Sequence, residues 1–125
     1  AQKKTLNHLA TSLFLSNAAG KYDLKELPVQ AQYAPIEAIQ ILDYNEDGQL
    51  DVLLCGNDSH QKLRMGKSDA NYGVLLKGKE QGDTEYMSQT QSGLARKGDV
   101  QSILQLENRL LFGINEGAVI AYELN

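Results

Sequence analysis

The chain has 125 residues, of which 42% are hydrophobic and 22% are charged, a balance typical of a globular domain and not of a disordered chain. Sixteen acidic residues outnumber twelve basic ones and leave a formal net charge of −4, which argues against general affinity for nucleic acid or for anionic membrane surfaces. A single cysteine rules out an intrachain disulfide framework and a thiolate zinc site, and no apolar run approaches the ~20 residues that a membrane helix needs.

Short apolar runs separated by turn-forming residues predict an all-β fold. The runs are rich in Val, Ile, Leu and Tyr, and glycines divide them along the chain. Several runs are continuous and do not alternate with polar residues, which is typical of strands buried on both faces in stacked sheets. In chain order the predicted strands are 12–16, 36–42, 50–55, 74–77, 100–106, 109–114 and 118–122.

The N-terminal residues carry two competing signals. Leu6, Leu9 and Leu13 have the spacing of one face of a helix, whereas Asn7 and Thr11 weaken a helix. We favour a strand over a helix for residues 12–16 and predict no conformation for residues 1–11.

A weak internal repeat groups the predicted strands. Cys55-Gly56-Asn57 aligns with Gly113-Ile114-Asn115 at an offset of 58 residues. At an offset of 64 residues, Ile36, Ala38, Ile39 and Leu42 align with Val100, Ser102, Ile103 and Leu106. A period near 60 with about four strands per copy is typical of a β-propeller or a similar array.

This repeat predicts how the strands are grouped along the chain. We expect the last two strands of one blade in residues 12–35, a complete blade of four antiparallel strands in 36–92, and the first three strands of another blade in 93–125. Residues 1–11 form a separate N-terminal segment in this scheme. Since a closed propeller needs roughly four to eight blades, the chain should be a fragment, assemble with other chains, or form an open stack.

The segment at residues 43–51, Asp-Tyr-Asn-Glu-Asp-Gly-Gln-Leu-Asp, has the oxygen spacing of a calcium loop. Gly48 at loop position 6 permits the sharp bend that turns oxygens inward. Three clustered carboxylates would repel one another without a cation among them, and Ca²⁺ prefers six to eight hard oxygen ligands, whereas Mg²⁺ demands a stricter octahedron. The predicted ligands are the side chains of Asp43, Asn45, Asp47 and Asp51 and the backbone carbonyl of Gln49.

This loop differs from an EF-hand, because position 12 is Leu54 and not a bidentate glutamate, and because strands and not helices flank the loop. We therefore predict a nine-residue calcium loop within a β-hairpin. The alternative is an acidic hairpin turn with Asp-Gly chemistry and no metal.

The loop, with an isoleucine-rich strand before it and Asp-Val-Leu-Leu at 51–54 after it, resembles the FG-GAP/VCBS repeat, the blade unit of integrin-α-type β-propellers. The order of the later segments Gly56-Asn57, 66–70, 73–76, 92–94 and 98–100 is similar to that of secreted bacterial FG-GAP-like proteins related to the cartilage acidic protein family. The resemblance covers most of residues 12–125. The chain departs from the family pattern in two ways. The first Phe-Gly pair, which gives the FG-GAP motif its name, is not intact. The second repeat lacks an acidic loop, so one calcium ion per chain is expected.

The resemblance implies an extracellular, periplasmic or cell-surface location, structural calcium, and adhesion or another binding role without catalysis. It implies a protein or glycan ligand, no binding of nucleic acid and no membrane insertion. Further copies of the chain in a homo-oligomer, or the remainder of a larger propeller, are candidate assembly partners. Binding residues often lie on loops over a rigid scaffold, and tyrosine is enriched at interfaces. The candidate partner surface consists of Tyr33, Tyr44, His60, Arg64 and Tyr72.

Two other functions stay open at this point. Open sheet edges could pair with another chain and make this an assembly module, or the acidic residues could belong to a carbohydrate-active enzyme.

Other short motifs favour ordinary structural roles. Gly66-Lys67-Ser68 ends like a P-loop, but Gln61 stands where that motif needs glycine. Cys55 is expected to be a small buried hydrophobe, His8 and His60 to be loop residues, and Asp99 to cap a turn or strand. The glycosylation pattern at 57–59 is interpreted as a chance match.

Overall fold

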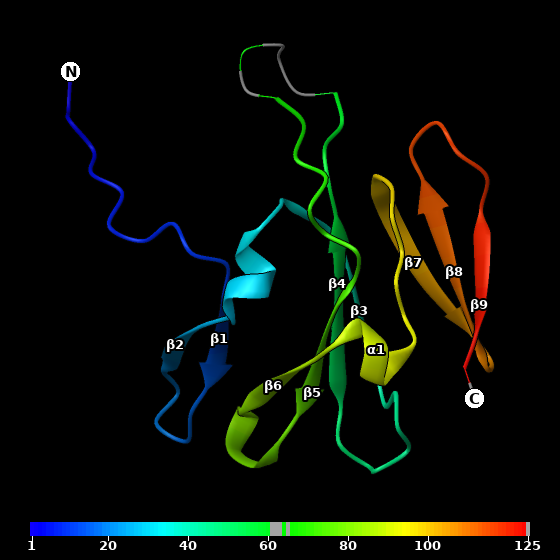
Figure 1. Cartoon of the computed structure of the whole chain (residues 1–125). Helices are drawn as coiled ribbons and strands as arrows, with labels where there is room; N and C mark the ends of the chain where they lie inside the picture. The colour runs from blue at the N-terminus through cyan, green and yellow to red at the C-terminus, as the bar shows by residue number, and fades with distance from the viewer. Residues whose placement is uncertain (61–63, 65, 125) are drawn as a thin grey trace.

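The computed structural model describes residues 1–60, 64 and 66–124 (Figure 1). In this part of the chain nine strands form three antiparallel sheets, ordered β1-β2, β3-β4-β5-β6 and β7-β8-β9, so the all-β prediction is confirmed. The strands are β1 Ser12–Ser16, β2 Tyr22–Glu26, β3 Ile36–Leu42, β4 Asp51–Gly56, β5 Val74–Gly78, β6 Thr84–Met87, β7 Val100–Leu106, β8 Arg109–Ile114 and β9 Ile120–Glu123.

All seven strands predicted from apolar runs are present with small shifts at their ends, and β2 and β6 are two further strands that only the expected grouping implied, without a position. The sheets contain two, four and three strands, which is the grouping that the repeat predicts. The helical turns are short: η1 Val29–Gln32, η2 Glu80–Gly82 and α1 Gln89–Ser92. Across the described residues no helix has the length and apolar character needed to cross a membrane.

The N-terminal segment lies outside the sheets (Figure 1). Leu6 and Leu9 are 79% and 86% exposed, so their helical spacing does not bury an apolar face. The strand predicted for residues 12–16 is confirmed as β1.

The middle sheet packs on both of its faces, as the continuous apolar runs predict. In β4, Leu53 and Cys55 belong to a core shared with Leu110 and Phe112 of β8. Leu54 points the other way and belongs to a second core, formed with Leu13 of β1 and with Leu27 and Ala31 near η1. Because alternate side chains of a strand point to opposite faces, β4 supplies both cores, and Figure 1 shows its sheet between the other two.

Two pairs of strands share the same pairing irregularity at the offsets of the sequence repeat. β3 and β4 pair with a register shift between Ile36 and Ala38. β7 and β8 pair with the same shift between Val100 and Ser102, at the predicted offset of 64. Their partners, Gly56 and Cys55 in β4 and Ile114 and Gly113 in β8, follow the predicted offset of 58. The first strands of the two sheets, β3 and β7, lie against each other.

Candidate metal centre

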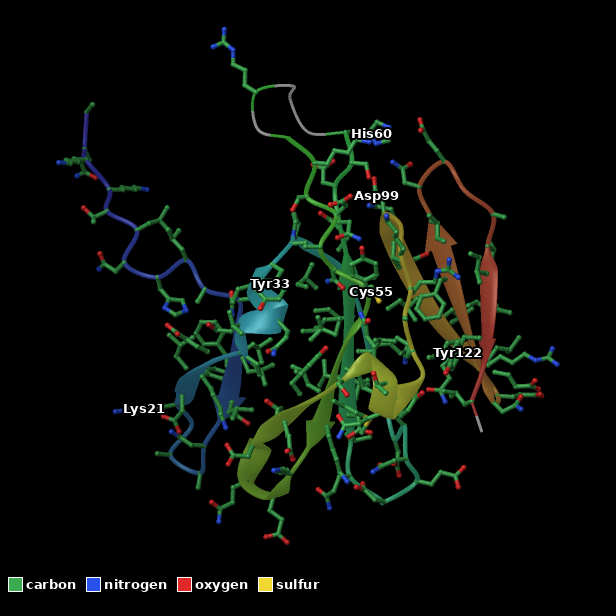
Figure 2. The ribbon with its side chains drawn as sticks, in the orientation of Figure 1. Lys21, Tyr33, Cys55, His60, Asp99 and Tyr122 are labelled. Atoms are coloured by element: carbon green, nitrogen blue, oxygen red, sulfur yellow. The ribbon has the colours of Figure 1, made fainter. Side chains whose placement is uncertain are left out.

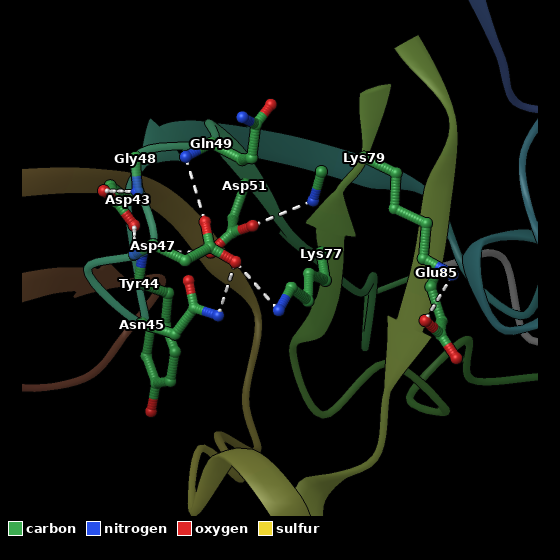
Figure 3. Close-up of polar contacts among 11 residues, drawn as sticks. Asp43, Tyr44, Asn45, Asp47, Gly48, Gln49, Asp51, Lys77, Lys79 and Glu85 are labelled. Carbon is green, nitrogen blue, oxygen red and sulfur yellow. Dashed lines mark hydrogen bonds and ion pairs between the residues drawn. The ribbon is translucent and has the colours of Figure 1, made fainter. Parts of the chain in front are cut away.

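The loop at residues 43–51 connects β3 to β4 and folds around the carboxylate of Asp43 (Figure 3). Its Oδ1 accepts a hydrogen bond from the Asp47 backbone N–H at 3.1 Å, and its Oδ2 accepts one from Gly48 at 2.8 Å. Gly48 has a φ of 81°, a left-handed conformation that glycine adopts without strain. The bend predicted at Gly48 is therefore confirmed.

Asp51, the first residue of β4, is completely buried. Its Oδ1 accepts the backbone N–H of Gly78 at 2.8 Å, and its Oδ2 accepts that of Tyr44 at 2.9 Å. The carboxylate thus ties the start of the loop to the end of β5. Both oxygens of this buried carboxylate therefore have a backbone N–H partner.

Asp47 is the carboxylate with a cation beside it. Its Oδ2 lies 2.8 Å from the ammonium Nζ of Lys77 on β5 and accepts a hydrogen bond from the Asn45 amide at 2.9 Å. Its Oδ1 accepts the Gln49 backbone N–H at 2.9 Å. The hydrogen bond from Lys77, followed by those from Gln49 and Asn45, lowers the pKa of Asp47 from 3.8 to about 2, and the same pair raises the pKa of Lys77.

The loop offers hard oxygen atoms of the kind that Ca²⁺ prefers, and the cation nearest to them is the Lys77 ammonium beside Asp47. Asp43, Asn45 and Asp47 lie together on the loop, while Asp51 lies buried beneath it (Figure 3). In the described residues no three His, Cys, Asp or Glu side chains form a group that could hold a metal ion. An ion at this loop would compete with Lys77 for Asp47.

The five candidate partner residues do not share one surface. Tyr33 and Tyr72 line the same cavity. Tyr44 lies elsewhere and is committed to the core, since its hydroxyl donates to the Ser92 carbonyl and burial raises its pKa. His60 lies beside Asp99, away from Tyr33 (Figure 2), and Arg64 is an exposed residue of the same long loop as His60.

Asp99 links the loop after β4 to the start of β7. Its Oδ1 accepts the Ser59 hydroxyl at 2.7 Å, and its Oδ2 accepts the Ser59 backbone N–H at 2.9 Å. His60 lies 3.7 Å from Asp99 and 3.2 Å from Glu116. The hydrogen bond from the Ser59 side chain is the main cause of a lowered Asp99 pKa. The Ser59 hydroxyl bonds Asp99 directly, whereas a Ser-His-Asp triad places the histidine between the serine and the carboxylate.

Sequence reasoning missed a buried amide network at Asn57. Asn57 is 1% exposed, and its Nδ2 donates to the carbonyls of Asn71 at 2.7 Å and Gly98 at 3.0 Å. Its Oδ1 accepts the Asn71 backbone N–H at 2.8 Å. The recurrence of Asn57 as Asn115 was the one available signal. Burial of the amide also keeps Asn57 from acting as a glycosylation acceptor in the folded chain.

Cys55 is the buried hydrophobe that the sequence predicts. It is 1% exposed within the core between the second and third sheets (Figure 2). Burial raises the pKa of its thiol to about 12, so the thiolate needed for nucleophilic or metal chemistry is strongly disfavoured.

Comparisons of the chain with protein-family models, with curated proteins and with solved structures found no match in any of the three. The resemblance to FG-GAP repeats therefore depends on the residues of the loop at 43–51 and on the order of the strands.

Acid should weaken the fold in part through Asp47. A carboxylate with a lowered pKa stabilises the fold above its unfolded pKa and loses that effect as the pH falls through its folded pKa. For Asp47 the ordinary pKa is 3.8 and the pKa in the fold is about 2, so the loss occurs as the pH falls through this range. Urea unfolding of wild type and Asp47→Asn between pH 5 and pH 2 should show a shallower loss of stability in the variant. Asp69→Asn, at an exposed position, is the control, and its stability should fall with pH as that of wild type does. The prediction is contradicted if the stability of Asp47→Asn falls with pH as steeply as that of wild type.

Proposed function

We propose that the chain is a non-catalytic interaction module of the FG-GAP/VCBS type, in which successive sheets are blades of a β-propeller and Ca²⁺ stiffens the loop at residues 43–51. The observation that carries this proposal is the position of that loop. It joins the first two strands of the four-stranded sheet and folds around Asp43. Its Asp47 carboxylate pairs with the Lys77 ammonium. An extracellular, periplasmic or cell-surface location belongs to the same proposal.

Exposed apolar residues support a stack that continues beyond the described sheets. Ile39 and Ile41 are 62% and 56% exposed, yet they pair with Leu54 and Val52 and so share the face that Leu13 of β1 and the η1 segment cover elsewhere. Leu104 and Leu106 of β7 are similarly exposed, on the face opposite the core residue Ile103. Isolated sheets rarely leave such faces in water.

In this proposal the ion cross-links the two ends of the loop. Asp43, Asn45 and Asp47 would bind it by their side chains, Gln49 would bind it by its carbonyl, and Asp51 would complete the site from below. A bound divalent cation would add positive charge beside carboxylates that now depend on backbone N–H groups and on Lys77. The role is structural, since nothing in the loop provides a reacting group aimed at a substrate.

Calcium titration of two lysine variants tests the proposal. Lys77→Met removes the ammonium that competes for Asp47 and should tighten Ca²⁺ binding severalfold in isothermal titration calorimetry. Lys79→Met is the matched control, because Lys79 follows directly after the end of β5 and pairs with Glu85, 2.6 Å away. Its affinity for Ca²⁺ should equal that of wild type. Absence of Ca²⁺ binding in both wild type and Lys77→Met would favour the metal-free hairpin.

Assembly with further chains is the second candidate function, and the exposed isoleucines of β3 favour it. If a second copy covers this face, sedimentation velocity should give a discrete oligomer. Ile41→Lys should then shift the protein to monomer, because a charge would be buried without a partner. The control is Val119→Lys, at a 69% exposed position outside the strands. A wild-type monomer at all concentrations would contradict assembly between copies.

A further inference from the structure

We propose that the cavity lined by Tyr33, Tyr72 and Tyr86 binds one ring of a neutral sugar. The inference rests on the binding role proposed above and names a ligand class for it. The cavity measures about 160 Å³. Its walls come from the η1 region, the turn before β5, β6 and the start of α1, and its complete lining is Gln30, Tyr33, Ala70, Tyr72, Gly73, Val74, Tyr86 and Gln89.

The lining of this cavity contains no charged side chain. Three other cavities in the described part of the chain each have at least two charged residues in their lining: Lys77 and Glu85 line one, Lys79 and Glu80 another, and Asp43 and Glu107 a third. The contrast matters in a protein that is 22% charged. A neutral ligand can enter the tyrosine cavity without leaving a buried charge unpaired, whereas an ionic ligand would find no partner among the lining side chains.

The polar atoms of the lining are available to a ligand. Among residues 1–60, 64 and 66–124, the hydrogen bonds of the structure engage none of the three tyrosine hydroxyls and neither of the two glutamine side-chain amides. Tyr33 and Tyr72 are 53% and 38% exposed, which opens the cavity to solvent, while Tyr86 packs against the core. One cavity therefore offers five uncommitted polar groups beside three aromatic rings.

This combination suits a sugar ring. Such a ring has an apolar face of C–H groups, which can lie on a tyrosine ring, and a rim of hydroxyls, which need both donors and acceptors. Tyrosine hydroxyls and glutamine amides supply both kinds of hydrogen bond. A proline-rich peptide is the alternative occupant of an aromatic surface, but it is extended and needs a groove, whereas this site is one compact cavity with many polar groups.

Saturation-transfer NMR with small neutral sugars tests the inference. The probes are the methyl glycosides of glucose, galactose, mannose and N-acetylglucosamine, with glucuronate as the charged comparator and a proline-rich decapeptide as the alternative. At least one neutral sugar should receive saturation. Tyr33→Ala and Tyr72→Ala should reduce that signal at least fivefold, and Gln89→Ala should reduce it with little effect on folding. Tyr22→Ala, at a 70% exposed tyrosine of β2, should leave it unchanged.

Three results would overturn the inference: no transfer to any neutral sugar, equal transfer in wild type and the cavity variants, or preferred binding of glucuronate or the peptide. Melting curves of each variant establish that it is folded. Calcium binding measured on the same samples separates the two proposals, because a chain that binds Ca²⁺ but no sugar contradicts only this inference. The bound sugar should remain intact, since the proposed role is binding without hydrolysis.

Discussion

Asn57→Ala is expected to lower the free energy of unfolding by roughly 2–4 kcal/mol. Removal of the amide leaves buried hydrogen-bonding groups without a partner, at a cost of about 1–3 kcal/mol each. The groups are the N–H and carbonyl of Asn71 and the carbonyl of Gly98. Urea unfolding monitored by circular dichroism measures the effect. Since Gly98 precedes β7 and Asn71 precedes β5, the variant should also loosen the third sheet against the second.

Asn115→Ala is the matched control for this prediction. Asn115 holds the equivalent place in the repeat, but its side chain is exposed, and substitutions at such surface sites typically change stability by about 0.5 kcal/mol or less. Equal destabilisation by the two substitutions would show that the Asn57 network contributes nothing specific.

Removal of Ca²⁺ is expected to lower the melting temperature substantially. At a free Ca²⁺ concentration about 100-fold above Kd, binding to the folded state stabilises it by about 2.7 kcal/mol, which for a domain of this size corresponds to roughly 10 °C. Differential scanning calorimetry with Ca²⁺ and then with chelator measures the shift. Mg²⁺ at the same concentration should restore little of it, because a flexible loop with many oxygens suits the larger ion.

Asp43→Ala is the variant that assigns this shift to the loop. It removes the carboxylate that accepts from Asp47 and Gly48, so the variant melts lower in any buffer. The informative quantity is therefore its difference between Ca²⁺ and chelator, which should vanish. Asp69→Ala should keep the wild-type difference. A shift that persists in Asp43→Ala would place the ion elsewhere.

Strand order and repeat could be predicted because they depend on local patterns. Apolar runs located the seven strands that supply most of the two cores, and the offsets of 64 and 58 reproduced the pairing register. β2 and β6 could not be located from the sequence because neither is an apolar run. β2, Tyr22–Glu26, has four exposed residues of five, and β6, Thr84–Met87, has only four residues and none buried.

The candidate site was predictable only within its own loop. The bend at Gly48 follows from local chemistry, but the approach of Lys77 depends on the pairing of β4 with β5. The burial of Asp51 beneath Gly78 depends on that pairing too. The cavity of Tyr33, Tyr72 and Tyr86 combines residues from three segments of the chain. The sequence grouped Tyr44 with Tyr33 and Tyr72, although the Tyr44 hydroxyl donates to the Ser92 carbonyl, and it did not identify Tyr86.

A crystal structure from crystals grown with millimolar CaCl₂ tests directly whether the loop at residues 43–51 binds Ca²⁺. The calcium-loop proposal predicts electron density for one ion with oxygen ligands at about 2.3–2.6 Å, contributed by Asp43, Asn45 and Asp47, and a Lys77 ammonium displaced from its position 2.8 Å from Asp47. A loop without ion density, in which Lys77 still pairs with Asp47, would contradict it and identify residues 43–51 as an acidic hairpin held by its own hydrogen bonds.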